Sequence, residues 1–223
     1  MSLVSNLFIL FVAAGVFVYY IVPRKFQWIV LLIFSYIYYL AGGPRYVIFI
    51  LFSTFVTWLT ALLIEKTETN GSHIGAKRFL ILGLILNFGM LGIVKYTNFT
   101  IENINALFHL HLRGIELLFP LGISFYTFQS SGYLLDVYWK RCKAEKQPFK
   151  YALFVSYFPQ ILQGPIGRYN RLADQLYAEH KFKLENITRG FERILWGFFK
   201  KMILADWAAV FSDAIFNDPE KYN

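Results

Sequence analysis

Charged residues and cysteines are scarce in this sequence. Only 16% of its 223 residues are Asp, Glu, Lys or Arg, whereas a typical soluble domain carries about 25%. This scarcity argues against a soluble globular protein, and the 57% content of hydrophobic residues predicts an all-α, polytopic membrane protein. The single cysteine, Cys142, excludes a disulfide within the chain and a cluster of cysteine metal ligands.

Motifs of soluble enzymes are also missing. The sequence contains no Gly-x-Ser-x-Gly nucleophile elbow, no phosphate-binding glycine loop and no His-Glu-x-x-His zinc helix. All four histidines lie outside the apolar runs, and we interpret them as surface residues that form no metal site. They are His73, His109, His111 and His180.

The net charge of +8 does not indicate a nucleic-acid partner. A nucleic-acid-binding domain gathers Lys and Arg on one face, whereas here they form short clusters between apolar runs. Such clusters are typical of topology signals in membrane proteins.

Five apolar stretches are predicted to cross the bilayer, because about 20 helical residues span its hydrocarbon core. They are residues 3–22, 26–41, 46–64, 79–94 and 117–139. With the N-terminus outside, ten Lys and Arg residues fall in cytoplasmic loops and three in the opposite loops, which follows the positive-inside rule. We interpret residues 65–78 as a polar loop without a fold of its own, and residues 96–116 as an amphipathic interfacial helix.

Two further apolar stretches do not fit a simple crossing. Residues 151–166 are short, contain Pro159 and Gly164, and lie between two basic clusters. A segment that enters the membrane and returns explains both features, and a short tilted helix is the alternative. Residues 190–216 contain Lys200 and Lys201, which are costly at the centre of a span, so we predict an interfacial or broken helix.

Polar residues within the apolar stretches are candidates for function, because burial in the membrane is costly unless they face protein or a cavity. Asn87 is expected to form hydrogen bonds between helices. Gln129, Gln160 and Gln163 are expected to line a cavity, with packing as the alternative. Asp136 is close to the cytoplasmic cluster, where a salt bridge with Lys140 is one interpretation.

Four separated motifs occur in order along the second half of the chain. They are Pro120-Leu-Gly-Ile-Ser-Phe-Tyr-Thr-Phe-Gln129, Asp136-Val-Tyr138, Phe158-Pro-Gln160 and Gln163-Gly-Pro-Ile166 with Arg168-Tyr169. In these motifs the chain resembles the membrane-bound O-acyltransferase (MBOAT) family, and within it the bacterial branch of alginate O-acetyltransferase-like proteins. Shorter similarities at Lys95-Tyr-Thr-Asn-Phe99 and Gly197-Phe-Phe-Lys-Lys201 extend the resemblance over nearly the whole chain.

The resemblance implies a helical membrane protein with a central tunnel, located in the bacterial plasma (inner) membrane. It implies O-acyl transfer, in particular O-acetyl transfer to a hydroxyl of a cell-surface polysaccharide. The implied partners are the lipid bilayer, a cytoplasmic acyl donor such as acetyl-CoA or an acylated carrier, and an extracytoplasmic acetyltransferase. No bound cofactor is expected. The residues expected to line the substrate tunnel are Tyr126, Gln129, Gln160, Gln163, Gly164, Pro165 and Arg168.

The catalytic histidine of the family belongs to a Trp-His pair, and no such pair occurs in this sequence. Acyl transfer to an alcohol needs a base, and histidine is the usual one. We therefore predict no catalytic residue in this chain and interpret residues 1–223 as a single membrane domain, the N-terminal part of a longer acyltransferase. A transporter-like protein and a non-catalytic membrane scaffold are the alternatives.

Overall fold

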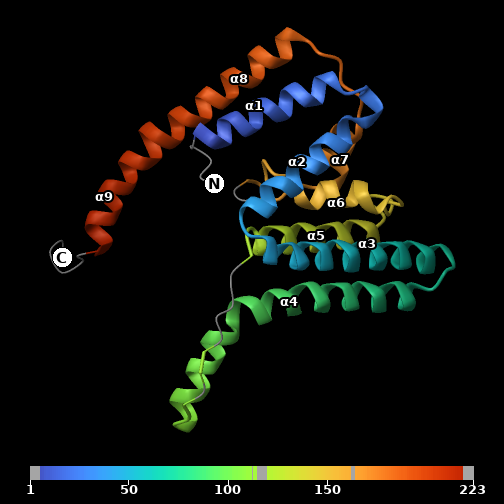
Figure 1. The fold of residues 1–223 in the computed structure, drawn as a ribbon. Helices are drawn as coiled ribbons and strands as arrows, with labels where there is room; N and C mark the ends of the chain where they lie inside the picture. The colour runs from blue at the N-terminus through green and yellow to red at the C-terminus, as the bar shows by residue number, and fades with distance from the viewer. Residues whose placement is uncertain (1–5, 112, 115–119, 162–163, 218–223) are drawn as a thin grey trace. The chain divides into compact units, whose positions relative to one another are not determined.

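The computed structural model describes residues 6–111, 113–114, 120–161 and 164–217 (Figure 1). These residues form helices and connecting turns, without strands. The chain divides into two compact units, Met1–His180 and Lys181–Asn223.

The first three helices match three of the predicted apolar stretches. They are α1 (Asn6–Ile21), α2 (Gln27–Ala41) and α3 (Val47–Thr69). A 3₁₀ turn at Arg24–Phe26 joins α1 to α2, and another at Pro44–Tyr46 joins α2 to α3. Proline and glycine end helices at low cost only near their termini, which explains why the chain turns at these places.

The fourth helix is longer than the sequence predicts. Helix α3 continues to Thr69, and α4 (His73–Phe108) begins three residues later. The prediction of an unstructured loop over residues 65–78 was therefore wrong. Glu and Lys are good helix formers, and the Ser72 side chain caps α4 by accepting a hydrogen bond from the Gly75 amide at 3.3 Å.

Helix α4 also runs through residue 95 without a break, so residues 96–108 are not a separate helix. It ends at His109, which takes the left-handed conformation (φ 53°). The helical stretches Pro44–Thr69 and His73–Phe108 are each long and apolar enough to cross a membrane.

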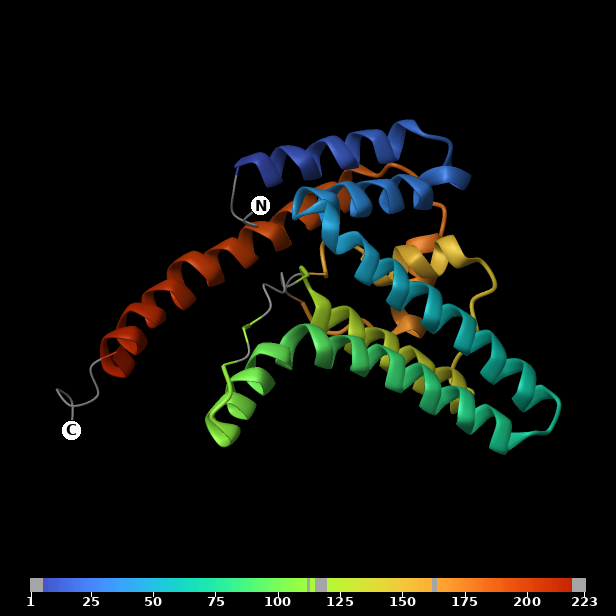
Figure 2. The ribbon, with the colours of Figure 1, turned by 60° about the horizontal axis from the view of Figure 1, so that its bottom comes forward.

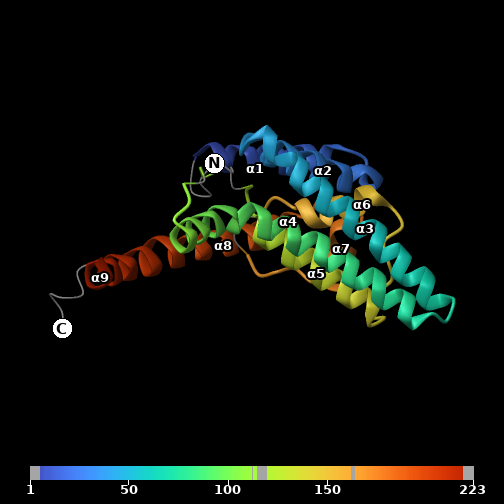
Figure 3. The ribbon, with the colours of Figure 1, turned by 90° about the horizontal axis from the view of Figure 1, so that it is seen from below.

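Helices α3, α4 and α5 (Ile123–Tyr138) lie side by side (Figures 1 and 3), and Figure 2 shows the tight hairpin of α3 and α4. Asn87 of α4 is fully buried between them. Its side chain accepts a hydrogen bond from Ser53 Oγ at 2.6 Å and donates one to Thr57 Oγ1 at 3.0 Å. The predicted role of Asn87 in joining helices is confirmed.

Gly83 allows these helices to approach closely. A Cβ atom at this position would lie 2.7 Å from Leu134 Cδ1 of α5 and 2.8 Å from Thr60 Oγ1 of α3. Both distances are shorter than a van der Waals contact, so a larger residue would separate α4 from its neighbours.

Two short helices follow α5. Helix α6 (Pro148–Ser156) packs against α2 and α3, and α7 (Tyr169–Tyr177) packs against α6. The described part of residues 157–168 between them is not helical. The backbone N–H of Phe158 donates to Ser35 Oγ at 3.2 Å, which ties this connection to α2. Entry of residues 151–166 into the membrane stays a prediction.

His180 corrects the interpretation of all histidines as surface residues. It is half-buried, and its Nδ1 lies 2.8 Å from the Tyr19 hydroxyl. The buried Gln27 side chain donates to the His180 carbonyl at 3.0 Å and accepts from its amide at 2.9 Å. His180 is held against α1 by Tyr19 and against α2 by Gln27. The buried Gln27 side chain needs both a donor and an acceptor, and the amide and carbonyl of His180 provide them.

The second unit is a continuous helical run. It consists of α8 (Leu184–Phe199), a π-helical segment at Lys200–Ala205, and α9 (Asp206–Asn217). The π segment starts at the two lysines that led us to expect an interruption, and Lys201 pairs with Asp206 at 2.5 Å. Interfacial placement of this run stays a prediction.

Candidate functional site

A cavity of about 380 Å³ lies between α5 and the segment that leads into α7. Gln129, Gly132 and Asp136 of α5 line its wall, and their spacing of three and four residues puts them on one helix face. The lining residues are Gln129, Gly132, Tyr133, Leu135, Asp136, Trp139, Arg141, Ile166, Gly167, Arg168 and Tyr169.

Two glutamine side chains approach Gly167, which lines this cavity. A Cβ atom at Gly167 would lie 2.9 Å from Gln160 Oε1 and 3.7 Å from Gln129 Nε2. Gln129 Nε2 donates to the Phe154 carbonyl at 3.0 Å, which orients its amide. The buried Gln160 Oε1 has no hydrogen-bond partner among the described residues. The atom has almost no accessible surface, and Gln160 lies behind Gly167 and not among the lining residues of the cavity.

The position of Gln160 depends on Gly122, the residue before α5. Gly122 has φ 69°, and a Cβ atom there would lie 2.2 Å from the Ile161 carbonyl oxygen. Only glycine permits this backbone conformation together with so close an approach. The start of α5 is thereby placed directly against the turn that carries Gln160.

Arginine side chains give the cavity a positive charge. Arg168 precedes α7 and Arg141 follows α5, and both line the cavity. Arg141 Nη1 is 3.5 Å from the mostly buried carboxylate of Asp136, whereas Lys140 pairs with Glu68 at 2.8 Å. The interpretation of Asp136 as a partner of Lys140 was therefore wrong. Two guanidinium groups against one carboxylate attract an anionic ligand.

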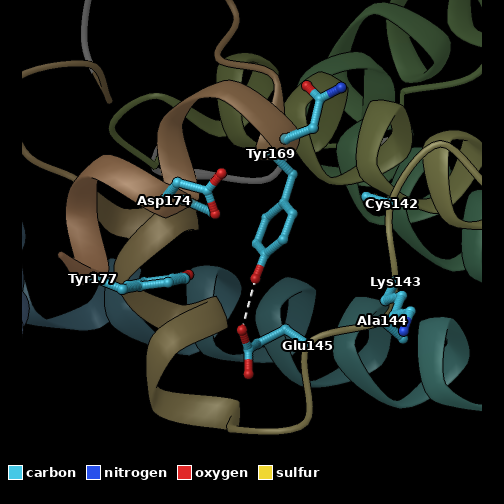
Figure 4. Close-up of a pocket in the computed structure, with 9 residues that line it drawn as sticks. Cys142, Lys143, Ala144, Glu145, Tyr169, Asp174 and Tyr177 are labelled. Carbon is cyan, nitrogen blue, oxygen red and sulfur yellow. Dashed lines mark hydrogen bonds between the residues drawn. The ribbon is translucent and has the colours of Figure 1, made fainter.

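Tyr169 forms the wall between this cavity and a second one of about 350 Å³. Its hydroxyl donates to Glu145 Oε2 at 2.7 Å, as Figure 4 shows from the side of the second cavity. Its ring centroid is 4.7 Å from that of Tyr133, whose hydroxyl accepts from the Glu145 amide at 2.8 Å. Burial raises the pKa of Tyr169, so its hydroxyl stays protonated and remains a donor to Glu145.

The predicted tunnel residues have different positions in the structure. Gln129 and Arg168 line the cavity, and Gln160 is in contact with Gly167 at its wall. Tyr126 is fully buried beside Tyr39, outside the cavity. Two more, Gly164 and Pro165, are exposed and do not line it. Gln163 lies outside the described residues.

Several cavity residues were not predicted from the sequence. Gly132 is one helical turn from Gln129, and this spacing could have indicated it. Gly167 and Tyr169 reach the cavity only because the segment before α7 folds back onto α5, and no local pattern indicates that contact.

Asp136 supplies the one carboxylate in the described wall of this cavity, and it lies 3.5 Å from Arg141 Nη1. None of the four histidines is among its lining residues. Cys142 lies at the second cavity, where burial raises the pKa of its thiol to about 12. A thiol with that pKa is a poor nucleophile near neutral pH.

Comparison with known proteins shows which proteins this chain resembles. The chain is 33% identical over 219 residues to the probable alginate O-acetylase AlgI of Pseudomonas syringae pv. tomato, a match that covers 95% of this chain and 41% of that protein. It is 32% identical over 212 residues to the peptidoglycan O-acetyltransferase of Helicobacter pylori, covering 83% of this chain and 39% of that protein. Over most of its length the chain is therefore similar to O-acetyltransferases of the membrane-bound O-acyltransferase family.

A further relative is the probable alginate O-acetylase AlgI of Azotobacter vinelandii. It is 32% identical over 225 residues, and the match covers 96% of this chain and 44% of the relative. The chain thus spans about two fifths of the length of these relatives. No family model and no solved structure matches the chain.

Proposed function

We propose that this chain forms the part of a membrane O-acyltransferase that receives the acyl donor, in an enzyme that acetylates a hydroxyl of a cell-surface polysaccharide. The observation that carries this proposal is the positively charged cavity beside Gln129 and Gln160, in a chain similar to alginate and peptidoglycan O-acetyltransferases. In this proposal the chain crosses the bacterial plasma membrane several times, with its N-terminus outside.

The charges of the cavity fit an anionic donor. Arg141 follows the end of α5 that the positive-inside rule assigns to the cytoplasm, and Arg168 lines the same cavity. Acetyl-CoA carries phosphates, and an acylated carrier carries a phosphate on its prosthetic arm. Guanidinium groups bind phosphate through paired hydrogen bonds. The acyl carbonyl of the donor would then lie near the Gln129 side chain, which lines the cavity.

The hydroxyl proton of the acceptor requires a base. In this proposal the base is a histidine outside the described cavity wall, so the chain by itself binds the donor but does not transfer the acyl group. Tyr169 cannot take this role near neutral pH because burial raises its pKa.

The test measures donor binding and transfer separately, with the purified chain in lipid nanodiscs. Radiolabelled acetyl-CoA and an acylated carrier protein serve as the two donors. We expect Arg168→Gln to weaken binding about tenfold or more, the effect of one charge-assisted hydrogen bond. Arg45→Gln is the control, because Arg45 lies just before the start of α3 and lines neither of these two cavities.

Two results would contradict the proposal. Binding of neither donor would show that the cavity is not a donor site. Transfer of the labelled acetyl group to alginate or peptidoglycan by the purified chain would show that the base lies within it. Passage of a small solute across the membrane, without donor binding, would support a transporter-like protein instead.

A further inference from the structure

Helix α5 ends in a chain reversal at Lys140. The backbone N–H of Lys140 donates to the Val137 carbonyl at 3.0 Å, and that of Arg141 donates to the Asp136 carbonyl at 2.8 Å. These bonds define a Schellman motif, in which the residue after the helix cap takes the left-handed conformation. Lys140 has this conformation, with φ 58°. Glycine is the usual residue here, because the conformation is strained for any residue that has a Cβ atom.

The Lys140 side chain makes a contact that glycine could not make. Its Nζ lies 2.8 Å from Glu68 Oε1, near the end of α3. Only 9% of the Glu68 side chain is exposed, and the same oxygen lies 2.7 Å from His73 Nδ1 at the start of α4. One carboxylate thus joins the end of α5 to the hairpin of α3 and α4. This contact compensates for the strain at Lys140, since a strained backbone persists only where the surrounding structure holds it.

The reversal at Lys140 turns Arg141 back onto the end of α5. Arg141 Nη1 lies 3.5 Å from Asp136 Oδ1, and its guanidinium carbon lies 4.7 Å from the centre of the Trp139 ring. Arg141, Asp136 and Trp139 all line the cavity beside α5. Asp136 lies five positions before Arg141, so their contact needs the chain to fold back at Lys140. A chain that left α5 in an extended conformation would carry Arg141 away from this carboxylate.

Lys140 and Glu68 do not line that cavity. They line a separate cavity of about 500 Å³, and among the described lining residues Arg141 alone is common to the two. A structural effect of Lys140 on a ligand in the first cavity would therefore pass through Arg141. Lys143 also lines the second cavity and is exposed, but it forms no ion pair within the described part of the chain. It provides a control for the loss of one positive charge.

We propose that Lys140 is a positioning residue for donor binding. Its contact with Glu68 holds the left-handed reversal, and the reversal places the Arg141 guanidinium in the cavity where the donor binds. Lys140 itself makes no contact with the donor. This inference rests on the function proposed above for that cavity. The alternative to be excluded is that Lys140 attracts an anionic donor through its charge alone.

The first test compares substitutions that separate conformation from charge. The full chain in lipid nanodiscs is titrated with radiolabelled acetyl-CoA and, in parallel, with an acylated carrier protein. We expect Lys140→Ala to weaken donor binding about tenfold, as Arg141→Gln does, the effect of one hydrogen bond to a charged group. Lys140→Gly should lose less affinity, because glycine adopts the reversal without strain. Equal losses for glycine and alanine would indicate attraction by charge and overturn the proposal. The control Lys143→Ala should change affinity less than about twofold, since an exposed charge is screened by salt.

Two further variants test whether Lys140 acts through Arg141. Glu68→Gln should weaken donor binding, because Lys140 loses its anionic partner, whereas attraction by charge alone predicts tighter binding once a negative charge is removed. Lys140→Ala added to Arg141→Gln should cause no further loss of affinity, because both changes remove the same contact with the donor. Losses that multiply in the double variant, or tighter binding by Glu68→Gln, would overturn the proposal.

Hydrogen exchange, read by mass spectrometry, tests the reversal without a donor. The amides of Lys140 and Arg141 are bonded within it, so residues 139–143 should exchange several times faster in Lys140→Ala and Glu68→Gln than in the wild type. Unchanged exchange in both variants would show that the contact does not hold the reversal, and would overturn the proposal.

The two proposals can fail separately. A wild-type chain that binds neither donor would refute the proposed function and the positioning role with it. Normal donor binding by the wild type, together with unchanged affinity of Lys140→Ala and Glu68→Gln, would refute the positioning role alone. Far-UV circular dichroism of each variant checks that its helices are intact.

Discussion

Replacing Gly122 with alanine should disturb the candidate site more than the same replacement at any other glycine. The new Cβ would lie 2.2 Å from the Ile161 carbonyl oxygen, which is backbone and cannot rotate away. The residue also has φ 69°, a conformation that costs a non-glycine residue about 1–2 kcal/mol. The conformational strain and the displacement of the turn at Ile161 together should lower the free energy of unfolding by about 2–4 kcal/mol.

Gly71 provides a matched control. It also has positive φ (79°), but a Cβ atom there would meet nothing within 4 Å. Gly71→Ala should therefore cost only the conformational strain of about 1–2 kcal/mol. Thermal unfolding of both variants in the same detergent measures the difference, which isolates the contact with Ile161.

The same contact predicts a functional effect. Movement of the turn would shift Gln160 away from Gly167, so Gly122→Ala should also weaken donor binding under conditions where the protein remains folded. If Gly122→Ala and Gly71→Ala unfold at the same temperature and bind donor equally, the close packing of α5 on this turn is refuted.

Three further predictions follow from the cavity and the helix contacts. Gly132 lines the cavity, and a Cβ atom there would meet no atom within 4 Å. Gly132→Phe should therefore fill the cavity and reduce donor affinity at least about tenfold, whereas the control Gly89→Phe on α4 should leave donor affinity unchanged. Equal donor affinities of the two variants would exclude this cavity as the donor site. Asn87→Leu should lower stability by about 1–2 kcal/mol, because Ser53 and Thr57 lose a buried partner, whereas the exposed Asn103→Leu should have little effect in the same unfolding assay. Lys140 lowers the pKa of the Glu68 carboxyl, mainly by a hydrogen bond, from its usual 4.5. A carboxyl whose pKa is lower in the folded than in the unfolded protein stabilises the fold above its unfolded-state pKa, and this stability is lost as the pH falls through its folded-state pKa. The wild type should therefore lose more stability than Glu68→Gln below about pH 4.5. Parallel plots of stability against pH for the two proteins would contradict this.

The polar cavity combines predicted and unpredicted residues for a physical reason. Gln129 and Arg168 could be selected from the sequence because polar side chains near apolar runs are costly unless they have a role. Their meeting with Gly167 depends on a chain reversal after α6, which a close backbone contact at Gly122 holds in place. Tyr126 shows the opposite case, since it lies on the same helix as Gln129 but faces the core beside Tyr39.

The sequence by itself determined the all-helical class, the places of α1, α2 and α3, and the similarity to O-acetyltransferases. These follow from long apolar runs, from the prolines and glycines between them, and from motifs that can be compared directly. Local patterns of this kind do not require knowledge of distant contacts.

Only the tertiary structure decided that α4 is one long helix, that His180 is held by Tyr19 and Gln27, and that two glutamines converge at Gly167. Each of these features depends on which residues far apart in the chain pack together, and that packing is decided by the whole fold.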